Sequence, residues 1–480
     1  MTIRRQVKFI AAICFLVLLV GGILLYALPS HSSSEVWGRA IKVRGVPGVG
    51  LETGANLYSI SCPGIGDCSA VGQVERKQNR NQPIVEDEVD GKWRGAQILE
   101  GLSTRNEGLN TGATVVSCAA PGDCAAGGSY SVTRNTMSVF VATETHGRWG
   151  NAVPLAGPSI QKAGSNSYLT SISCASPGNC AAGGNLGGTH GSRAFVVDDV
   201  RGVWGKVTLL SGAQGYSMHG TNVSSISCAS PGSCSAVGDS NKTPRGDSAF
   251  SVSEKNGVWG SATEIPGLAE LISGGTDVEI SVSCSRGPNC SAEGNYLDDS
   301  GVTQSFLVDE TEGTWSRAFD IPGIVALDGR HIEELHSISC GAPGDCVAGG
   351  AYGTGSHEQA FLVNEVNGQW GDPMSIPGLA TINKGKFTTV DKVSCPSAGN
   401  CGVIGGYNGK GGYTQAFASN EVNGSWGLAE ALGAPSFSGA VGAQVSAISC
   451  APLSTCTVTG NVFMSMTTSI LFLQSSRLRS

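Results

Sequence analysis

Apolar and polar residues alternate over short stretches of this chain, and the alternation recurs eight times at a nearly fixed interval. The stretch 171–184, SISCASPGNCAAGG, places apolar and small residues at every second position on both sides of a segment rich in Pro, Gly and Asn. A two-residue period is that of a β-strand, and these turn residues reverse the chain within a few positions. Each copy therefore predicts a β-hairpin.

A second hairpin follows the first in each repeat. The segment QAFLVNE at 359–365 alternates and leads through an Asn-Gly pair to a tryptophan. Asn-Gly is typical of two-residue hairpin turns, because both central residues need positive φ. Four short strands per repeat of this length are typical of a propeller blade. All eight tryptophans occupy this position, 55 or 56 residues apart: Trp37, Trp93, Trp149, Trp204, Trp259, Trp315, Trp370 and Trp426.

The first and last repeats are each incomplete, and they complement one another. Trp37 has no hairpin before it, whereas SILFLQSS at 469–476 matches the strand that precedes a tryptophan but has none after it. If VWGRAIKV at 36–43 pairs beside 469–476, the eighth blade is completed from both ends of the chain and the ring closes without open edges. An open solenoid would need caps instead of a split repeat. We therefore predict an all-β, eight-bladed propeller over 36–476.

Sixteen of the 17 cysteines form C-x5-C pairs, one in each first hairpin. Zinc is the alternative, but its ligands usually come as C-x2-4-C with a second pair nearby, and the seven histidines are scattered. An even set of regularly paired cysteines outside the cytoplasm indicates disulfides. The predicted bridges are Cys62–Cys68, Cys118–Cys124, Cys174–Cys180, Cys228–Cys234, Cys284–Cys290, Cys340–Cys346, Cys395–Cys401 and Cys450–Cys456.

The N-terminal segment predicts a membrane anchor. Residues 1–8 are basic and 9–28 form an apolar run of 20 residues without a charge, long enough to span a bilayer of roughly 30 Å. A cleaved signal peptide is the alternative, although no A-x-A site follows the run. We expect a cytoplasmic tail at 1–8, a single transmembrane span at 9–28, a linker at 29–35, an extracytoplasmic propeller at 36–476 and a tail at 477–480.

Charge and composition exclude one class of partner. The 30 basic and 38 acidic residues give a net charge of −8, which offers no broad positive surface for nucleic-acid phosphates. The 70 glycines and the low charged fraction of 14% suit turns and short strands. We expect a monomer that binds no nucleic acid, cofactor or metal.

The S-[IV]-S-C-x5-C-x-A-x-G repeat with its following N-G-x-W-G resembles that of secreted or membrane-anchored bacterial propellers, particularly actinobacterial ones. The resemblance covers roughly 36–476 and implies the fold, but it carries over no catalytic or binding residues. The turn is also similar to the Asp-box of sialidase-type propellers. It departs from that motif because tryptophan follows glycine by two residues instead of three, so sialidase activity is not implied.

An acidic residue stands five places before seven of the tryptophans, which raises the question of paired catalytic carboxylates. Because the same residue recurs at the same depth of each hairpin, we interpret it as a structural group that caps the hairpin or bonds to its backbone. The seven residues are Glu88, Glu144, Asp199, Glu254, Glu310, Glu365 and Glu421.

Binding residues are sought instead in the connectors that differ between blades, since loops on a rigid scaffold carry function. Ordinary variation of solvated loops explains the same differences. An RGD at 245–247 and an acidic pair at 298–299 are further candidates, although neither alone makes an adhesion or calcium site. The candidate binding residues are Arg76, Lys77, Arg80, Arg245, Asp247, Asp298 and Asp299.

No Ser-His-Asp or Cys-His order is visible, so the sequence nominates no catalytic residue. We predict a membrane-anchored binding module for a protein or a cell-envelope component such as a polysaccharide. A carbohydrate-active enzyme, glycosidase or lyase, on the same ring is the alternative, and a purely structural envelope protein is a third possibility. Carboxylates and aromatic residues gathered at one end of the central channel would favour the enzyme.

Overall fold

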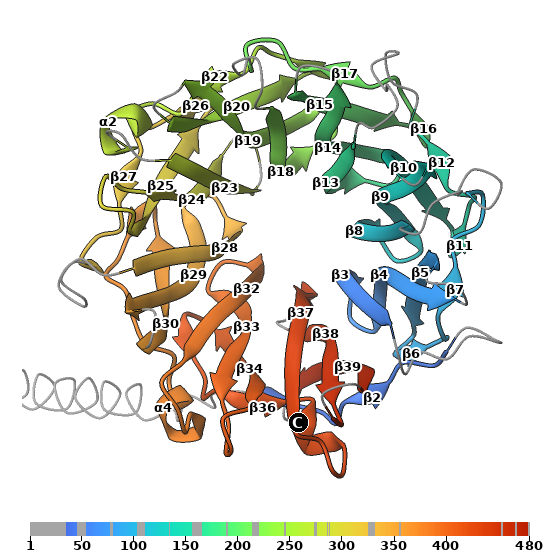
Figure 1. Ribbon diagram of the computed structural model, residues 1–480, viewed down its shortest axis with the longest axis vertical. Helices are drawn as coiled ribbons and strands as arrows, with labels where there is room; N and C mark the ends of the chain where they lie inside the picture. The colour runs from blue at the N-terminus through green and yellow to red at the C-terminus, as the bar shows by residue number, and fades with distance from the viewer. Residues whose placement is uncertain are drawn as a thin grey trace, which may run out of the picture. The chain divides into compact units, whose positions relative to one another are not determined.

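A computed structural model of the protein describes residues 35–45, 54–76, 80–102, 111–133, 135–155, 166–188, 191–213, 220–243, 246–272, 276–285, 287, 289–324, 332–354, 357–452, 455–465 and 468–478. Glu35–Leu478 form one compact unit. Within it, eight antiparallel sheets are arranged around a common axis (Figure 1). The predicted eight-bladed propeller is confirmed.

The innermost strand of each blade carries the first cysteine of a pair, and the second strand carries its partner. The innermost strands are β3 (Ala55–Gly64), β8 (Thr111–Ala120), β13 (Tyr168–Ser176), β18 (Thr221–Ser230), β23 (Thr276–Cys284), β28 (Ile332–Ala342), β32 (Thr388–Ser397) and β37 (Gly442–Cys450). The second strands are β4 (Asp67–Arg76), β9 (Asp123–Thr133), β14 (Asn179–Gly188), β19 (Ser233–Thr243), β24 (Cys290–Leu297), β29 (Asp345–Thr354), β33 (Asn400–Asn408) and β38 (Cys456–Phe463).

The third strands lead into the turns before tryptophan. They are β5 (Arg80–Val89), β10 (Thr136–Thr145), β15 (Gly191–Val200), β20 (Gly246–Lys255), β25 (Thr303–Thr311), β30 (His357–Val366), β34 (Thr414–Val422) and β39 (Ser469–Leu478).

The outer edge of each blade is made of short pieces that begin at tryptophan. The tryptophan pieces are β1 (Glu35–Trp37), β6 (Lys92–Trp93), β11 (Arg148–Trp149), β16 (Val203–Trp204), β21 (Val258–Trp259), β26 (Thr314–Trp315), β31 (Gln369–Trp370) and β35 (Ser425–Trp426). The pieces that follow are β2 (Ile41–Lys42), β7 (Gln97–Ile98), β12 (Val153–Pro154), β17 (Thr208–Leu209), β22 (Thr263–Glu264), β27 (Phe319–Asp320) and β36 (Glu430–Leu432). The helices α2 (Leu268–Ile272), α4 (Leu379–Ile382) and η1 (Ala434–Ser436) are single turns in connectors.

The eighth blade is completed from both ends of the chain, as predicted. The strand β1 pairs antiparallel with β39, with Trp37 opposite Ser476, and β2 continues the pairing with Ile41 opposite Leu473. The backbone N–H of Val43 also donates to the carbonyl of Leu471 at 3.0 Å. The N-terminal strand therefore supplies the fourth strand that the last repeat lacks.

All eight predicted disulfides form, each between the two strands of one hairpin. Closing a loop of seven residues removes unfolded-state entropy worth about 2 kcal/mol per bridge in the chain-entropy model. The serine before each first cysteine adds a link between blades. Its hydroxyl accepts a hydrogen bond of 2.9–3.0 Å from the backbone N–H of the first cysteine in the next blade, at all eight boundaries.

The last of these bonds, from Cys62 N–H to Ser449 Oγ, joins the eighth blade to the first and closes the ring.

The glycine of the C-x-A-x-G motif is explained by a close contact with the innermost strand. Gly350 lies opposite the fully buried Phe361, and a Cβ at this glycine would overlap the carbonyl oxygen of Glu334 on the innermost strand. Glycine therefore lets two strands and an aromatic ring meet in the blade core.

The two ends of the blades differ because the four strands alternate in direction. One end, the turn face, holds the cysteine turns and the Asn-Gly-type turns, which are tied together by bonds such as Gly91 N–H to the Gly66 carbonyl at 2.8 Å. The opposite end, the loop face, holds both sets of longer connectors. No helix in the part of the chain that the structure describes is long and apolar enough to cross a membrane, and the predicted span at 9–28 lies outside that part.

Candidate functional site

Arg76 and Arg80, two of the three predicted binding residues of blade 1, lie at the loop-face ends of two paired strands. Arg76 ends β4 and Arg80 begins β5, and the two residues are paired in register. Arg80 is exposed, and Lys77 lies outside the described residues.

The candidate residues of the fourth and fifth blades lie on two further loop-face connectors. Arg245 is outside the described residues, whereas Asp247 lies in β20 opposite Asn241. Asp298 holds its own turn, because its Oδ1 accepts from the N–H groups of Ser300 at 2.8 Å and Val302 at 3.0 Å. Asp299 is exposed beside it. The structure does not gather the predicted residues into one site, since Figure 1 shows their strands on separate blades.

The seven repeated acidic residues are buried, and several of them bond across a blade boundary. Glu310 accepts hydrogen bonds from Ser235 at 2.7 Å and from Ser253 at 3.1 Å, both in the preceding blade. Glu421 accepts likewise from Asn364 at 3.1 Å. Burial raises the pKa of the group to about 7 in Glu88, Glu144, Glu254 and Glu365 and to about 6 in Asp199. Their recurrence and their burial fit a structural role better than catalysis.

A different set of charged residues breaks the symmetry of the ring. On the innermost strands, Asp, Glu, Lys and His occur only in β23, β28 and β32, and the other five innermost strands contain none, nor any Arg. These three strands belong to neighbouring blades around the axis (Figure 1). We call their solvent-reached members the charged arc: Glu279, Glu334, His336, Asp391 and Lys392.

A repeated β-bulge sets the position of the arc. The pairing of β28 with β29 shifts by one residue between Leu335 and Ser337, and that of β32 with β33 shifts between Val390 and Lys392. His336 and Asp391 are therefore the extra, unpaired residues of the two bulges, where a side chain is re-aimed out of the pleat. Five other blades have a neutral residue there: Tyr58, Thr114, Thr170, Ser224 and Ser446.

His336 connects two blades and approaches a carboxylate. Its Nδ1 donates to the carbonyl oxygen of Val390 at 2.8 Å, which leaves Nε2 3.6 Å from Oε2 of Glu334. The hydroxyl of Thr170 bonds the equivalent carbonyl of the next blade, that of Val223. His336 thus keeps the link between blades and adds a titratable nitrogen beside a half-exposed acid.

A buried amide fixes the backbone next to the bulge. Nδ2 of Asn295 donates to the carbonyl of Leu335 at 2.7 Å, and its Oδ1 accepts from the N–H of Leu335 at 2.9 Å. The hydroxyl of Ser305 donates to the same Oδ1 at 2.7 Å and to the carbonyl of Glu333 at 3.2 Å. The fifth blade therefore holds the part of β28 that carries Glu334 and His336.

The arc acts on two acids, Glu293 outside it and Asp391 within it. The pKa of Glu293 is raised to about 8, chiefly by burial; Lys392 opposes this shift, and Glu279 and Glu334 contribute to it. Burial also raises the pKa of Asp391, which His336, Thr389 and Lys392 oppose. Glu293 stands on β24 where other blades have residues such as Val71, Gly349 and Ile404.

The arc offers carboxylates, one ammonium group and one imidazole, which suit a polar ligand of positive charge. No group of three or more His, Cys, Asp or Glu side chains is placed to hold a metal ion in the described ranges. The connectors give no sign of the arc, because its residues lie on the innermost strands. Aligning the eight innermost strands would have shown that their charges fall in three consecutive repeats.

Comparison with family models and with curated protein sequences finds no match. Solved structures similar to this chain include an ulvan lyase of polysaccharide lyase family PL25 bound to -[GlcA(1-4)Rha3S]-, with 11% identity, 91% of this chain and 95% of that chain covered, and a TM-score of 0.46. A sialidase of Trypanosoma rangeli has 10% identity and a TM-score of 0.37; the match covers 68% of this chain and only 56% of the sialidase.

The fucose-specific lectin of Aleuria aurantia has 10% identity, 63% of this chain and 94% of that chain covered, and a TM-score of 0.32. At such identities the likeness is one of scaffold. Neither a ligand nor an activity of these proteins is carried over to this chain.

Proposed function

We propose that the protein is a bacterial binding module, held at the outer side of the cell membrane by residues 9–28, whose charged arc takes a cationic part of a protein or envelope component. The observation that carries the proposal is the confinement of charge to three consecutive innermost strands of an otherwise repetitive ring. A feature common to all blades serves the fold. A feature of three neighbouring blades serves an asymmetric ligand.

The compartment is supported by the disulfides. Eight bridges, one in each blade, require an oxidising environment such as the outside of the cell or the periplasm. The apolar run at 9–28 with its basic flank supports an anchor, and the resemblance of the repeat to secreted and anchored bacterial propellers supports the same assignment.

The sign of the ligand's charge follows from the arc. Glu279 and Glu334 are solvent-reached carboxylates, and Lys392 is the one lysine among the arc residues. A cationic group would bind between carboxylates with complementary potential, whereas an anion would meet their repulsion. Binding should weaken with salt, because exposed charges are screened.

The test compares two model peptides, one of alternating Lys and Gly and one of alternating Glu and Gly, on the immobilised oxidised chain. We expect the Lys peptide alone to bind and its binding to fall with added salt. The variant E279Q/E334Q should lose this binding. The matched control E100Q/E312Q removes two exposed carboxylates elsewhere and should bind like the wild type. Equal binding by the two variants would refute the proposal.

A carbohydrate-active enzyme remains the second candidate, and one observation favours it. Glu334, His336 and Asp391 place acid and base groups on adjoining innermost strands, as hydrolysis or elimination of a glycosidic bond requires. Release of reducing ends or of an unsaturated uronate from envelope polysaccharide would establish it. Loss of this release in the variant H336A, with binding of the Lys peptide retained, would assign catalysis to the strands of the charged arc.

A further inference from the structure

At three blade boundaries the tryptophan of the outer edge bonds an aspartate of the preceding blade. The indole N–H of Trp149 donates to the carboxylate of Asp87 in the preceding blade, with Nε1 3.1 Å from Oδ2. Trp259 does the same with Asp198 at 3.0 Å, and Trp370 with Asp309 at 3.2 Å. An aspartate one place before the repeated acid satisfies the tryptophan of the next blade at these three boundaries, and the hydroxyl of Thr143 does so for Trp204 at 3.0 Å.

Between the fourth and fifth blades this aspartate is replaced by Ser253. The Ser253 hydroxyl donates to Glu310 Oε1 at 3.1 Å, and the buried Nε1 of Trp315 has no hydrogen-bond partner. A buried donor without a partner destabilises the folded state. Between the sixth and seventh blades, Trp426 Nε1 also has no hydrogen-bond partner. There the amide oxygen of Asn364 has no partner either, so that boundary has an acceptor of its own.

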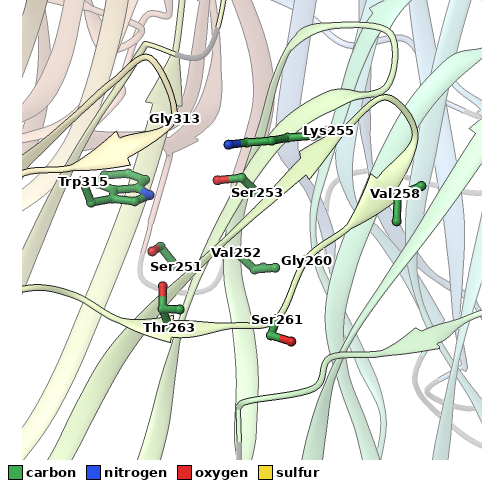
Figure 2. A pocket seen from close by; sticks show the side chains of 10 residues that line it. All are labelled: Ser251, Val252, Ser253, Lys255, Val258, Gly260, Ser261, Thr263, Gly313 and Trp315. Atoms are coloured by element: carbon green, nitrogen blue, oxygen red, sulfur yellow. The ribbon is translucent and has the colours of Figure 1, made fainter.

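A pocket of 310 Å³ lies where the aspartate is missing. We call it the rim pocket; its lining includes Ser251, Ser253, Lys255, Ser261, Thr263 and Trp315. Figure 2 shows the ammonium group of Lys255 and the hydroxyls of Ser251, Ser253 and Thr263 pointing into the space beside the indole ring. The pocket therefore combines an aromatic wall with one cation and several hydroxyls.

Lys255 acts electrostatically on the buried Glu310, whose pKa it lowers. Both oxygens of Glu310 already accept hydrogen bonds, from Ser235 and Ser253, and the lysine is exposed on the turn side of β20. Burial raises the pKa of Glu310, and the hydrogen bonds from Ser235 and Ser253 oppose that shift. Lys255, with its exposed side chain, and Trp315, whose indole N–H has no partner, both line the rim pocket.

We propose that the rim pocket binds a uronic acid unit of a polysaccharide, whose carboxylate takes the place that Asp87, Asp198 and Asp309 fill at other boundaries. The carboxylate accepts from the Trp315 N–H and pairs with Lys255. The sugar hydroxyls bond to the serine and threonine hydroxyls, and the indole gives the ring an apolar contact. A volume of 310 Å³ is at the lower end of the range for small-molecule sites, which suits one sugar unit.

The test is calorimetric titration of the full oxidised chain with D-glucuronate and D-galacturonate, with D-glucose as the neutral analogue and N-acetylaspartate as a peptide-like carboxylate. We expect a uronate to bind and the other two probes to bind at least roughly tenfold more weakly. Equal binding of glucose would refute the role of the carboxylate. Equal binding of N-acetylaspartate would refute the saccharide.

Three variants locate the site. K255Q removes the cation and W315F removes the indole N–H, and each should weaken uronate binding roughly tenfold. S253D restores the aspartate of the other boundaries and should abolish binding by filling the pocket while leaving the melting temperature the same or higher. The control K92Q removes an exposed lysine of an equivalent turn in the first blade and should bind like the wild type.

Wild-type binding by both S253D and W315F, or no heat from any uronate, would overturn the proposal. The rim pocket and the charged arc share no residue. The arc variant E279Q/E334Q should therefore keep uronate binding, and K255Q should keep binding of the Lys peptide. Failure of one assignment is thus distinguishable from failure of the other.

Discussion

Ring closure by the N-terminal strand makes the sharpest prediction about stability, and the substitution is Trp37→Ala. Trp37 is 8% exposed and packs in a core cluster with Leu432 and Phe472. A buried tryptophan contributes about 150–250 Å² of contact area, and truncating one to alanine costs about 3–5 kcal/mol. The strand β1 is only three residues long, and beyond it the N-terminal segment is held on β39 by the short strand β2 and by backbone bonds of Gly38 and Val43.

The expected result is a loss of unfolding free energy of about 3–5 kcal/mol, measured by urea denaturation with the disulfides intact. The N-terminal segment of the variant should also become sensitive to limited proteolysis, because its strand dissociates from β39 before the ring unfolds. The matched control is Trp204→Ala in the third blade, where the chain continues into the next blade on both sides of the strand.

The two variants separate packing from closure. Trp204→Ala should lose a similar free energy by packing but keep its N-terminus protected, since β1 stays in place. If Trp37→Ala unfolds at the wild-type urea concentration while Trp204→Ala is destabilised, β1 does not close the ring. If both variants expose the N-terminus equally, the strand pairing with β39 is not what protects it.

Three further changes test the repeat itself. Gly350→Ala should destabilise the protein by about 3 kcal/mol or more, because the added Cβ would overlap the carbonyl oxygen of Glu334. Gly406→Ala should cost little, because its Cβ would lie 3.5 Å from the nearest atom, in the ring of Phe387. Thermal unfolding distinguishes the two variants. Ser449→Ala should cost about 1–3 kcal/mol in urea, because it removes the acceptor of the Cys62 N–H at the closing boundary. Burial raises the pKa of Glu144 and its counterparts Glu88, Glu254 and Glu365 to about 7, so the folded state holds their protons more tightly than the unfolded state does. The free energy of unfolding should therefore fall as pH rises from about 4.5 to 7. Glu144→Gln should flatten this profile, and an unchanged slope in the variant would contradict the role of Glu144.

The sequence was sufficient for the blades because their determinants are local. A C-x5-C pair and an Asn-Gly turn each act within a few residues, so eight copies predict eight pairs of hairpins. Closure was also predictable, because the strand at 469–476 lacks a partner that 36–43 supplies, and Trp37 does lie opposite Ser476. The bond from the repeated serine to the next cysteine was not predictable, because it depends on the spacing between blades, which no single repeat contains.

The candidate site was less predictable because it depends on a one-residue shift of register. The sequence marks His336 as one residue in an alternating strand, and only the pairing of Leu335 and Ser337 with neighbouring glycines shows that it is the extra residue of a bulge. The rim pocket depends on a comparison across a boundary. Ser253 becomes informative when Asp198 and Asp309 are seen to bond the tryptophans of the following blades.

The repeat itself limits where a ligand site can arise. The cysteines, the serine before them and the glycine opposite the buried aromatic residue each make a contact that nearly every blade needs, so a change there costs stability before it can change binding. The bulge residue and the residue before the repeated acid are freer: the first varies from Thr170 to His336, and the second from Asp198 to Ser253, with the blade geometry unchanged. The bulge position carries His336 and Asp391 of the charged arc, the second position carries Ser253 of the rim pocket, and both sites lie within the fourth to seventh blades. In this ring, ligand specificity is therefore expected where one side chain can be exchanged without loss of a bond that every blade shares.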